Sequence, residues 1–282
     1  MRVGVIAPFV ARGDDEFPTW QAVRAYARHA EEVGFDSIWG FDHLYSGRDG
    51  VPPGDIHEAW TMLSAIAAVT SRVELGQLVT CTSFRSPGLL GKMAVTVDEI
   101  SGGRLTLGLG AGWYDDEYRA FGFPIDHRGT RFDEYMAVLA PLLRGEEVTF
   151  TGRYHRAEGA RLLPPPSRRL PLLIAGKGPR LLEMVARNAD AWNTAWYSEP
   201  NDTLHTRLSD LRRALEAAGR EPSSMRVTVG VYPEGLDDAD SLARALESFK
   251  GLGIDDLIVS QDRKDPTALD LLWRAVELAQ IG

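Results

Sequence analysis

Residues 104–113 read RLTLGLGAGW. Glycine occupies every second position from Gly108 to Gly112, while leucine fills positions 105, 107 and 109. Successive side chains of a β-strand point to opposite faces, so one face of this predicted strand is nearly bare. Glycine inside a strand often marks a close approach of a ligand or of another backbone segment. The bare face is therefore expected either to hold a flat ring or to pack closely against a neighbouring element.

Strand-like and helix-like segments alternate on the N-terminal side of this stretch. Predicted strands at 2–9, 35–41 and 73–80 alternate with predicted helices at 19–33, at 57–70 and from Pro87 to the pair Gly102-Gly103. Proline at the start and glycine at the end are the usual boundaries of a helix.

The alternation continues on the C-terminal side. Predicted helices cover 129–144, 179–189, 201–218, 238–251 and 266–279, and predicted strands cover 170–176, 189–194, 226–232 and 255–260. Residues at about 146–168 contain β-branched and aromatic residues and a triple proline but no helical period, which indicates a hairpin or an extended insertion.

Eight strands alternating with eight helices predict an α/β fold with a parallel sheet. Closure into a (β/α)8 TIM-type barrel is favoured over an open sheet, because a barrel leaves no strand edge exposed and fits a chain of 282 residues. The sequence therefore predicts a single barrel domain over residues 1–282, with the non-helical insertion between helix four and strand five.

Composition excludes several classes of function. The net charge of −9 opposes attraction to nucleic acid or to anionic lipid, and no apolar run is long enough to span a membrane. Cys81 is the single cysteine, so an internal disulfide and a multi-cysteine metal site are excluded. We expect a cytoplasmic protein without metal ligands that acts on a small molecule, as a homodimer.

The active site of a (β/α)8 barrel lies at the carboxyl ends of the strands. His43 is the one histidine of six directly at a predicted strand end with a carboxylate, Asp42, beside it. The other strand ends are aromatic or glycine-rich, and no nucleophile with a base stands among them. Since no side chain accepts or delivers hydride, this rim is typical of an enzyme whose planar organic cofactor carries the reaction.

The segment IAGKGPR (174–180) suggests a place for an anionic group of that cofactor. Pro179 is expected to begin a helix, which leaves the amides of residues 176–178 and the positive helix end facing an anion. Lys177 or Arg180 would add charge. A plain tight turn between strand and helix is the alternative interpretation.

The chain resembles the bacterial luciferase-like monooxygenase superfamily, in particular the branch of oxidoreductases that depend on the deazaflavin coenzyme F420. Four segments carry the resemblance: FDSIWGFDHL (35–44), the block from LGQLVT to GLGAGW (75–113), EYRAFGFPIDHRGTRFDEY (117–135) and IAGKGPRLLEMVARNADAWN (174–193). Together they cover most of the chain.

The resemblance implies where the cofactor binds and which residues react. His43 is expected to donate or accept the proton, and Asp42 to orient His43 or to hydrogen-bond the ring. Leu78 and Val79 match a bulge of strand three that commonly holds a non-prolyl cis peptide behind the ring. The expected cofactor-binding residues are Asp42, Leu78, Val79, Thr80, Ala111, Gly112, Ala175, Gly176, Lys177 and Gly178.

Two departures from the family pattern bear on the substrate. The F420-dependent glucose-6-phosphate dehydrogenases carry a glutamate where this chain has Trp113, and a threonine and a lysine where it has Ala195 and Ser198. A sugar phosphate is therefore not the expected substrate. Aromatic residues instead predict a pocket for a small apolar or aromatic substrate, with packing as the alternative role of Trp113. The predicted pocket residues are Phe9, Trp113, Trp196 and Tyr197.

The expected function is hydride transfer between coenzyme F420 and an unidentified small organic substrate. One alternative is an FMN-dependent luciferase-like monooxygenase, which takes reduced flavin and oxygen. The other is a non-catalytic flavin-binding or partner subunit.

Overall fold

The computed structural model describes residues 1–11, 16–47, 54–233, 238–261 and 265–282. Within them, nine strands form one sheet in which all neighbours are parallel, in the order β3-β2-β1-β11-β10-β9-β8-β5-β4. The strands are β1 (Arg2–Ile6), β2 (Ser37–Gly40), β3 (Glu74–Gln77), β4 (Thr80–Cys81), β5 (Leu107–Gly110), β8 (Leu172–Ala175), β9 (Ala191–Tyr197), β10 (Arg226–Val231) and β11 (Asp256–Val259).

The sheet closes on itself between β3 and the start of β5. Leu75 forms a parallel bridge with Leu105, and its amide donates to the carbonyl of Arg104 at 3.0 Å. β3 and β4 are two parts of one barrel strand, separated by Leu78 and Val79, which are joined by a cis peptide bond. The predicted TIM-type barrel is therefore confirmed, and a cis peptide lies at the bulge of strand three, where the family resemblance implies that one is common.

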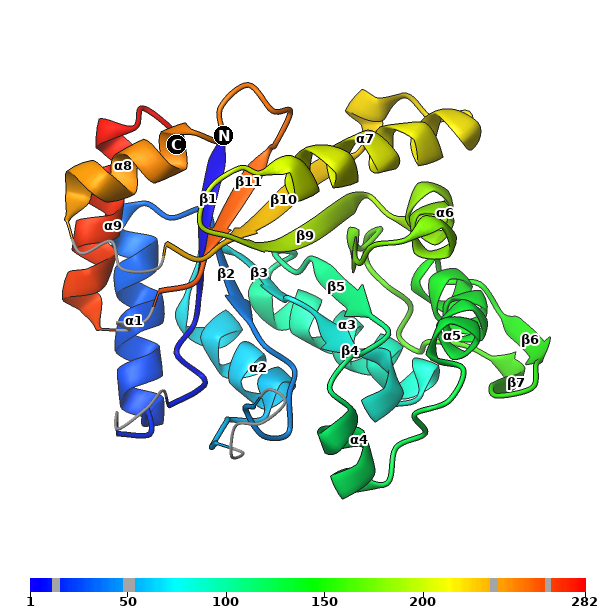
Figure 1. Cartoon of the computed structure of the whole chain (residues 1–282). Helices are drawn as coiled ribbons and strands as arrows, with labels where there is room; N and C mark the ends of the chain where they lie inside the picture. Colours follow the sequence, from blue (N-terminus) through cyan, green and yellow to red (C-terminus); the bar gives the residue numbers. More distant parts are fainter. Residues whose placement is uncertain (12–15, 48–53, 234–237, 262–264) are drawn as a thin grey trace.

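Helices cover the outside of the strands (Figure 1). The helices that follow the barrel strands are α1 (Trp20–Val33), α2 (Ala59–Val69), α3 (Pro87–Ser101), α5 (Arg128–Leu143), α6 (Pro179–Asn188), α7 (Asp202–Ala217), α8 (Ala239–Glu247) and α9 (Pro266–Leu278). α3 shows why the predicted boundaries hold: the Ser86 hydroxyl accepts from the Leu89 amide at its start, and Gly102 adopts a left-handed conformation at its end.

Two elements lie outside this repeat. β6 (Val148–Thr151) and β7 (Arg156–Ala160) form an antiparallel hairpin, which lies at the margin of the molecule away from the barrel strands in Figure 1. This hairpin is the predicted non-helical insertion. A short helix, α4 (Asp115–Phe121), follows β5 and was not predicted, because its seven residues give too little helical period to recognise.

The bare glycine face of β5 is occupied by the protein itself. A Cβ atom at Gly108 would lie 2.0 Å from the carbonyl oxygen of Gln77, and one at Gly110 would lie 2.6 Å from a methyl group of Val79. Both distances are shorter than side-chain atoms tolerate, so only glycine lets strand three approach at these positions. Of the two expected outcomes, close packing holds for Gly108 and Gly110, and the flat ring does not lie directly on them.

The amino ends of the strands carry a buried charge network. Glu74 on β3 binds Arg226 on β10 at 2.9 Å and Arg2 on β1 at 3.0 Å, and Arg226 also binds Asp256 on β11. Although burial alone raises the pKa of Glu74, the two guanidinium groups lower it overall. These charges satisfy one another at one end of the barrel and leave the carboxyl end for ligands. In the described part of the chain, none of the helices has both the length and the apolar composition of a membrane span.

Candidate functional site

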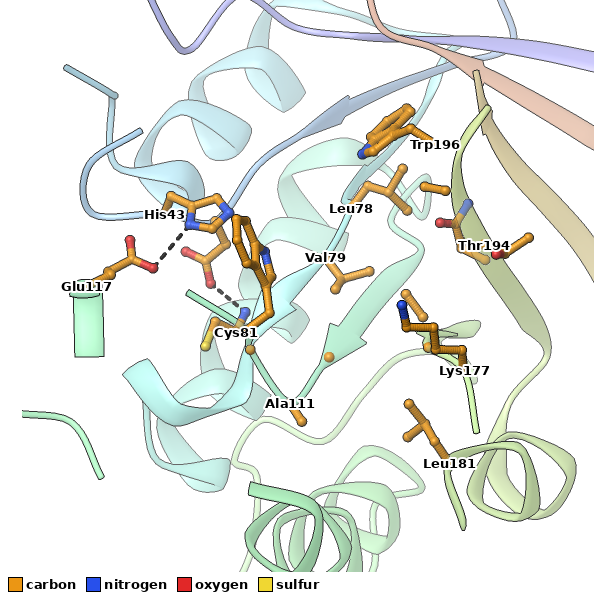
Figure 2. A pocket seen from close by; sticks show the side chains of 18 of the residues that line it. His43, Leu78, Val79, Cys81, Ala111, Glu117, Lys177, Leu181, Thr194 and Trp196 are labelled. Atoms are coloured by element: carbon orange, nitrogen blue, oxygen red, sulfur yellow. Dashed lines mark hydrogen bonds and ion pairs between the residues drawn. The ribbon is translucent and has the colours of Figure 1, made fainter. Parts of the chain in front are cut away.

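A cavity of about 410 Å³ opens at the carboxyl ends of the barrel strands (Figure 2). Residues from strand two, the bulge of strand three, β5, α4, the turn after β8, β9 and α7 line it. Its volume lies in the usual range for a small-molecule site. The cavity is therefore where the barrel rule places an active site.

An apolar wall runs along one side of this cavity. Leu78 and Val79 present the strand-three bulge to it, and Ala111 and Ala175 continue the wall on the strands beside it. Figure 2 shows Leu78 and Val79 turned toward the open space. The glycines of β5 allow this bulge to sit where it does, so they shape the wall indirectly.

His43 is held by a carboxylate from α4. Its Nδ1 lies 3.1 Å from Oε2 of Glu117, whose side chain is 1% exposed. The second carboxylate oxygen of Glu117 accepts the backbone amide of Leu44. A carboxylate is acceptor-only, so it selects the tautomer of His43 that carries a proton on Nδ1. Nε2 is then free of a proton and points away from Glu117 into the cavity (Figure 2).

Asp42 has a different partner from the expected one. Arg85 donates to both of its carboxylate oxygens at 2.6 and 2.9 Å, and the Cys81 amide donates at 2.9 Å. Burial raises the pKa of the Asp42 carboxyl, and Arg85 and the Cys81 amide oppose that rise. The expectation that Asp42 orients His43 is wrong, because Arg85 draws its carboxylate away and Glu117 holds the imidazole.

Gly112 lies two residues after β5, in a tightly packed corner. It has φ of +80°, and a Cβ there would lie 1.9 Å from the hydroxyl of Tyr118. That hydroxyl donates to the Ala111 carbonyl at 2.8 Å and lies 3.2 Å from the Cys81 sulfur. Burial raises the pKa of Cys81 to about 11, so the thiol stays protonated near neutral pH and is no nucleophile.

The turn between β8 and α6 keeps only part of the geometry expected for an anion site, because the Gly176 amide donates to the Asn193 carbonyl at 3.4 Å. Gly178 has φ of +96° and precedes Pro179, and no atom comes within 4 Å of where its Cβ would be. The backbone of Gly178 is therefore open to solvent. Lys177 points toward the cavity (Figure 2), and no acceptor among the described residues lies within hydrogen-bonding distance of its Nζ. Arg180, by contrast, binds Asp133 and Thr130, so it is not available at the turn.

Exposed aromatic rings stand at the cavity. Trp113 is 59% exposed and meets His43 edge-on, with ring centroids 5.8 Å apart. Trp196 is 40% exposed and meets Phe41 edge-on. Trp113 also stacks on Tyr114, with ring centroids 5.3 Å apart, so both interpretations of Trp113, packing and substrate contact, stay open.

The structure brings together most of the predicted site residues. The cavity is lined by Asp42, His43, Leu78, Val79, Ala111, Gly112, Trp113, Ala175, Gly176, Lys177 and Trp196. Four predicted residues do not line it: Phe9, Thr80, Gly178 and Tyr197.

Each of those four has a physical reason for its position. Phe9 is 1% exposed and packs in the core, where a Cβ on Gly40 would collide with its ring. Thr80 is fully buried. Gly178 lies one residue beyond the lining part of the turn and remains near it. Tyr197 is 5% exposed, and its hydroxyl accepts from Arg207 at 2.6 Å.

The sequence did not indicate several other lining residues. These are Cys81, Gly110, Glu117, Tyr118, Leu181, Asn193, Thr194, Ala195 and Arg207. A signal existed for six of them: Cys81 and Gly110 lie in the segment 75–113, Glu117 and Tyr118 in 117–135, and Leu181 and Asn193 in 174–193, all of which carry the resemblance.

Comparison with known proteins agrees with this geometry. The sequence profile of the luciferase-like monooxygenase family matches residues 1–277. The F420-dependent hydroxymycolic acid dehydrogenase of Mycobacterium tuberculosis is 29% identical over 86% of this chain and 66% of its own length. The F420-dependent glucose-6-phosphate dehydrogenase of Nakamurella multipartita is 32% identical over 78% of this chain and 61% of its own length. This chain thus spans somewhat less than two thirds of these relatives.

Among solved structures, an F420-dependent secondary alcohol dehydrogenase in complex with an F420-acetone adduct has the same fold. The two superpose with a TM-score of 0.81 over 99% of each chain, at 20% sequence identity.

Proposed function

The chain belongs to the luciferase-like monooxygenase family, and from this premise we propose that it is an oxidoreductase that transfers hydride between coenzyme F420 and a small organic substrate. The observation that carries the proposal is the pair His43–Glu117 beside the apolar wall. It supplies a proton acceptor next to a surface suited to a flat ring, and the Cys81 thiol that lines the cavity stays protonated near neutral pH.

The residues present fit a deazaflavin. Leu78, Val79 and Ala111 offer apolar contacts for one face of a planar ring. The open backbone at Gly178 and the side chain of Lys177 offer donors for the phosphate of the tail. A bound deazaflavin supplies the acceptor or donor of the hydride.

The protein's own contribution is the handling of the proton. When a hydroxyl carbon loses hydride, the hydroxyl proton passes to Nε2 of His43, and the carbonyl forms as the O–H bond breaks. In the reverse direction the same nitrogen returns the proton to the carbonyl oxygen. Glu117 stabilises the imidazolium that exists between these steps, because its carboxylate faces Nδ1–H at 3.1 Å.

The substrate is proposed to be apolar or aromatic in the part that contacts the rim. Trp113 and Trp196 are the exposed rings at the cavity. A ring or an alkyl group covering them removes apolar surface from water, which stabilises the complex by roughly 25 cal/mol for each Å² covered.

An FMN-dependent monooxygenase is the second candidate, supported by the family's own description as monooxygenases. The same wall and the same anion-binding turn suit either ring. A non-catalytic flavin-binding subunit has no specific observation in its favour, since the oriented histidine needs a reaction to explain it.

Titration of the purified protein with F420 and with FMN, followed by fluorescence quenching, tests the choice. We expect F420 to bind at least tenfold more tightly, which corresponds to about 1.4 kcal/mol. Micromolar FMN binding with no measurable F420 binding contradicts the proposal. Turnover with reduced or oxidised F420 and a panel of small alcohols and ketones separates an enzyme from a binding subunit.

A further inference from the structure

The charged side chains that line the cavity are unequally partnered. Asp42 is paired with Arg85, and Glu117 accepts from His43 and from the Leu44 amide. The two cationic lining residues are Lys177 and Arg207, and no described carboxylate lies within ion-pair distance of either. Positive charge therefore collects on the side of the cavity formed by β8 and β9.

The sheet register explains why these two cations share one side. Ala175, the last residue of β8, pairs with Asn193 on β9, which continues to Tyr197, so the turn after β8 begins beside Thr194. Lys177 comes just after β8, and Thr194, the next residue on β9, accepts from Arg207. Figure 2 shows Lys177 and Thr194 on the same side of the cavity, opposite Glu117.

Arg207 is held in a defined orientation. Its Nη1 donates to the Thr194 hydroxyl at 3.0 Å and to the Tyr197 hydroxyl at 2.6 Å. Both partners are buried, at 5% exposure each, and their hydroxyls lie 3.1 Å apart. The two hydrogens of Nη1 are thus used by neutral oxygens on β9.

Among the described residues, Nε and Nη2 of Arg207 have no hydrogen-bond or ion-pair partner, although the guanidinium carbon lies 5.7 Å from the centre of the Tyr197 ring. Arginine carries five N–H donors in a planar fork, so the edge formed by Nε and Nη2 remains available. That edge matches the spacing of two oxygens in a carboxylate or a phosphate. A half-buried cation with one edge fixed and the other open lacks the counter-charge that such a position requires.

We propose that Arg207 binds an oxyanion, a carboxylate or a phosphate, through its Nε/Nη2 edge, and that Lys177 adds a second positive charge to the same subsite. The proposal deepens the proposed function, because the oxyanion belongs either to the cofactor or to an acidic substrate. With Arg207, the β9 side of the cavity carries a cation, although this chain has Ala195 and Ser198 where the F420-dependent glucose-6-phosphate dehydrogenases have a threonine and a lysine. The substrate class favoured in the second case is an aromatic or apolar acid.

Arg207→Met tests this, because methionine keeps much of the side-chain length and removes the charge and the donors. Arg213→Met is the matched control: Arg213 lies on the same helix, is paired with Asp210 and is 72% exposed. Binding is measured by fluorescence quenching for two pairs of ligands, FMN with riboflavin and F420 with its deazaflavin ring lacking the tail. FMN and riboflavin differ by one phosphate group, whereas F420 and its tailless ring differ by the whole anionic tail. Inorganic phosphate and benzoate are titrated by calorimetry, against the free protein and the cofactor-loaded protein respectively.

The outcomes distinguish the sources of the anion. Loss of at least tenfold in affinity for the phosphate-bearing cofactor, with less than twofold change for the tailless ring, assigns the subsite to the cofactor. A tenfold loss for benzoate alone assigns it to the substrate. Unchanged affinity for all six ligands in folded Arg207→Met overturns the proposal. Equal losses in Arg213→Met would overturn it too, because they indicate a nonspecific charge effect.

A purely structural role for Arg207, tying α7 to β9, predicts a lower melting temperature with no selectivity between ligands. Should the methionine variant fail to fold, Arg207→Lys retains the charge and loses the bidentate edge. It is expected to weaken the same anionic ligand at least threefold, and equal binding would refute the bidentate contact. If neither ring binds the native protein, the proposed function fails, while the phosphate titration still decides whether Arg207 binds an oxyanion.

Discussion

Replacing Glu117 with glutamine is expected to turn His43 into the wrong tautomer for catalysis. Glutamine keeps the volume and one acceptor but replaces the other oxygen with an NH2 donor. The two contacts of Glu117 are with the Leu44 amide and with Nδ1 of His43. The amide of Leu44 can only donate, so the glutamine oxygen must face it and the NH2 group must face Nδ1.

The alternative orientation is less favourable. With the glutamine reversed, the Leu44 amide would face a second donor in a position where Glu117 is 1% exposed. A buried N–H left unsatisfied costs about 1–3 kcal/mol. The imidazole avoids this cost by moving its proton from Nδ1 to Nε2. Nε2, the nitrogen that faces the cavity, then carries a proton and cannot accept one from the substrate.

The size of the effect follows from the role of that nitrogen. Loss of a positioned general base costs roughly 10²–10⁴ in rate. In hydrolytic triads the same carboxylate-to-amide change leaves the histidine in the wrong tautomer and lowers kcat by about 10⁴. We therefore expect kcat of Glu117→Gln to fall by about 10²–10⁴, while the Kd for the cofactor changes less than threefold, because the wall and the turn are untouched.

The assay combines kinetics with nitrogen NMR of protein labelled at histidine. The spectrum of the native protein is expected to show Nδ1 of His43 protonated, assigned by comparison with His43→Ala, and the variant is expected to show Nε2 protonated. Glu134→Gln is the control, since Glu134 accepts three backbone amides but does not line the cavity. A folded Glu117→Gln that keeps the native tautomer and a rate within threefold refutes the reasoning.

Three further changes give sharp outcomes. His43→Ala should retain cofactor binding and lose about 10²–10⁴ in kcat; a rate within threefold of the native protein, with an unchanged melting temperature, would assign His43 a structural role. Gly110→Ala should weaken cofactor binding at least tenfold in a titration, because its Cβ would lie 2.6 Å from Val79 and push the bulge; native affinity would show that the bulge does not support the ring. Gly178→Val should weaken binding of the phosphate-bearing cofactor at least tenfold, since its φ of +96° suits glycine alone; unchanged affinity would leave the turn a purely structural element.

The reactivity of Cys81 follows from its raised pKa of about 11. Below that pH the thiol is protonated, and the thiolate, which is the reactive form, appears only as the pH rises through 11. Alkylation of the native protein by iodoacetamide at pH 8 is therefore expected to be at least tenfold slower than in the unfolded chain. Equal rates measured by mass spectrometry would contradict the burial of this thiol.

The barrel could be predicted from the sequence because each unit carries its own signals. The predicted helix beginning at Pro87 and ending at Gly102 matches α3, since capping and the left-handed turn depend on neighbouring residues alone. The number of barrel strands then follows from the regular alternation of strand-like and helix-like segments. The short helix α4 escaped, and the division of strand three into β3 and β4 was implied by the family resemblance alone, because a bulge follows from contacts across the sheet.

The same distinction explains the glycine face. Alternating glycine showed correctly that something approaches β5 closely, but the pattern has no way to name the partner. The partner is strand three, whose Gln77 carbonyl and Val79 side chain fill the space above Gly108 and Gly110. Physical closeness was predictable, and the identity of the neighbour required the three-dimensional register.

The polar partners in the cavity join segments that lie far apart in the chain. His43 and Glu117 are 74 residues apart, and Asp42 and Arg85 are 43 apart. The strand ends predicted His43 and Asp42 as site residues, and both line the cavity. Because the two are adjacent in sequence, Asp42 was also expected to be the partner of His43. The carboxylate that orients His43 instead comes from the first turn of α4, and the open cation comes from the first two turns of α7 at Arg207. In a closed barrel the helix that follows a strand begins at the carboxyl end of that strand, so its first turns face the same cavity. Polar residues in the opening turns of the helices are therefore candidate site residues for the same physical reason as residues at the strand ends. Here Glu117 orients the base His43, and Arg207 places a positive charge on the opposite side of the cavity.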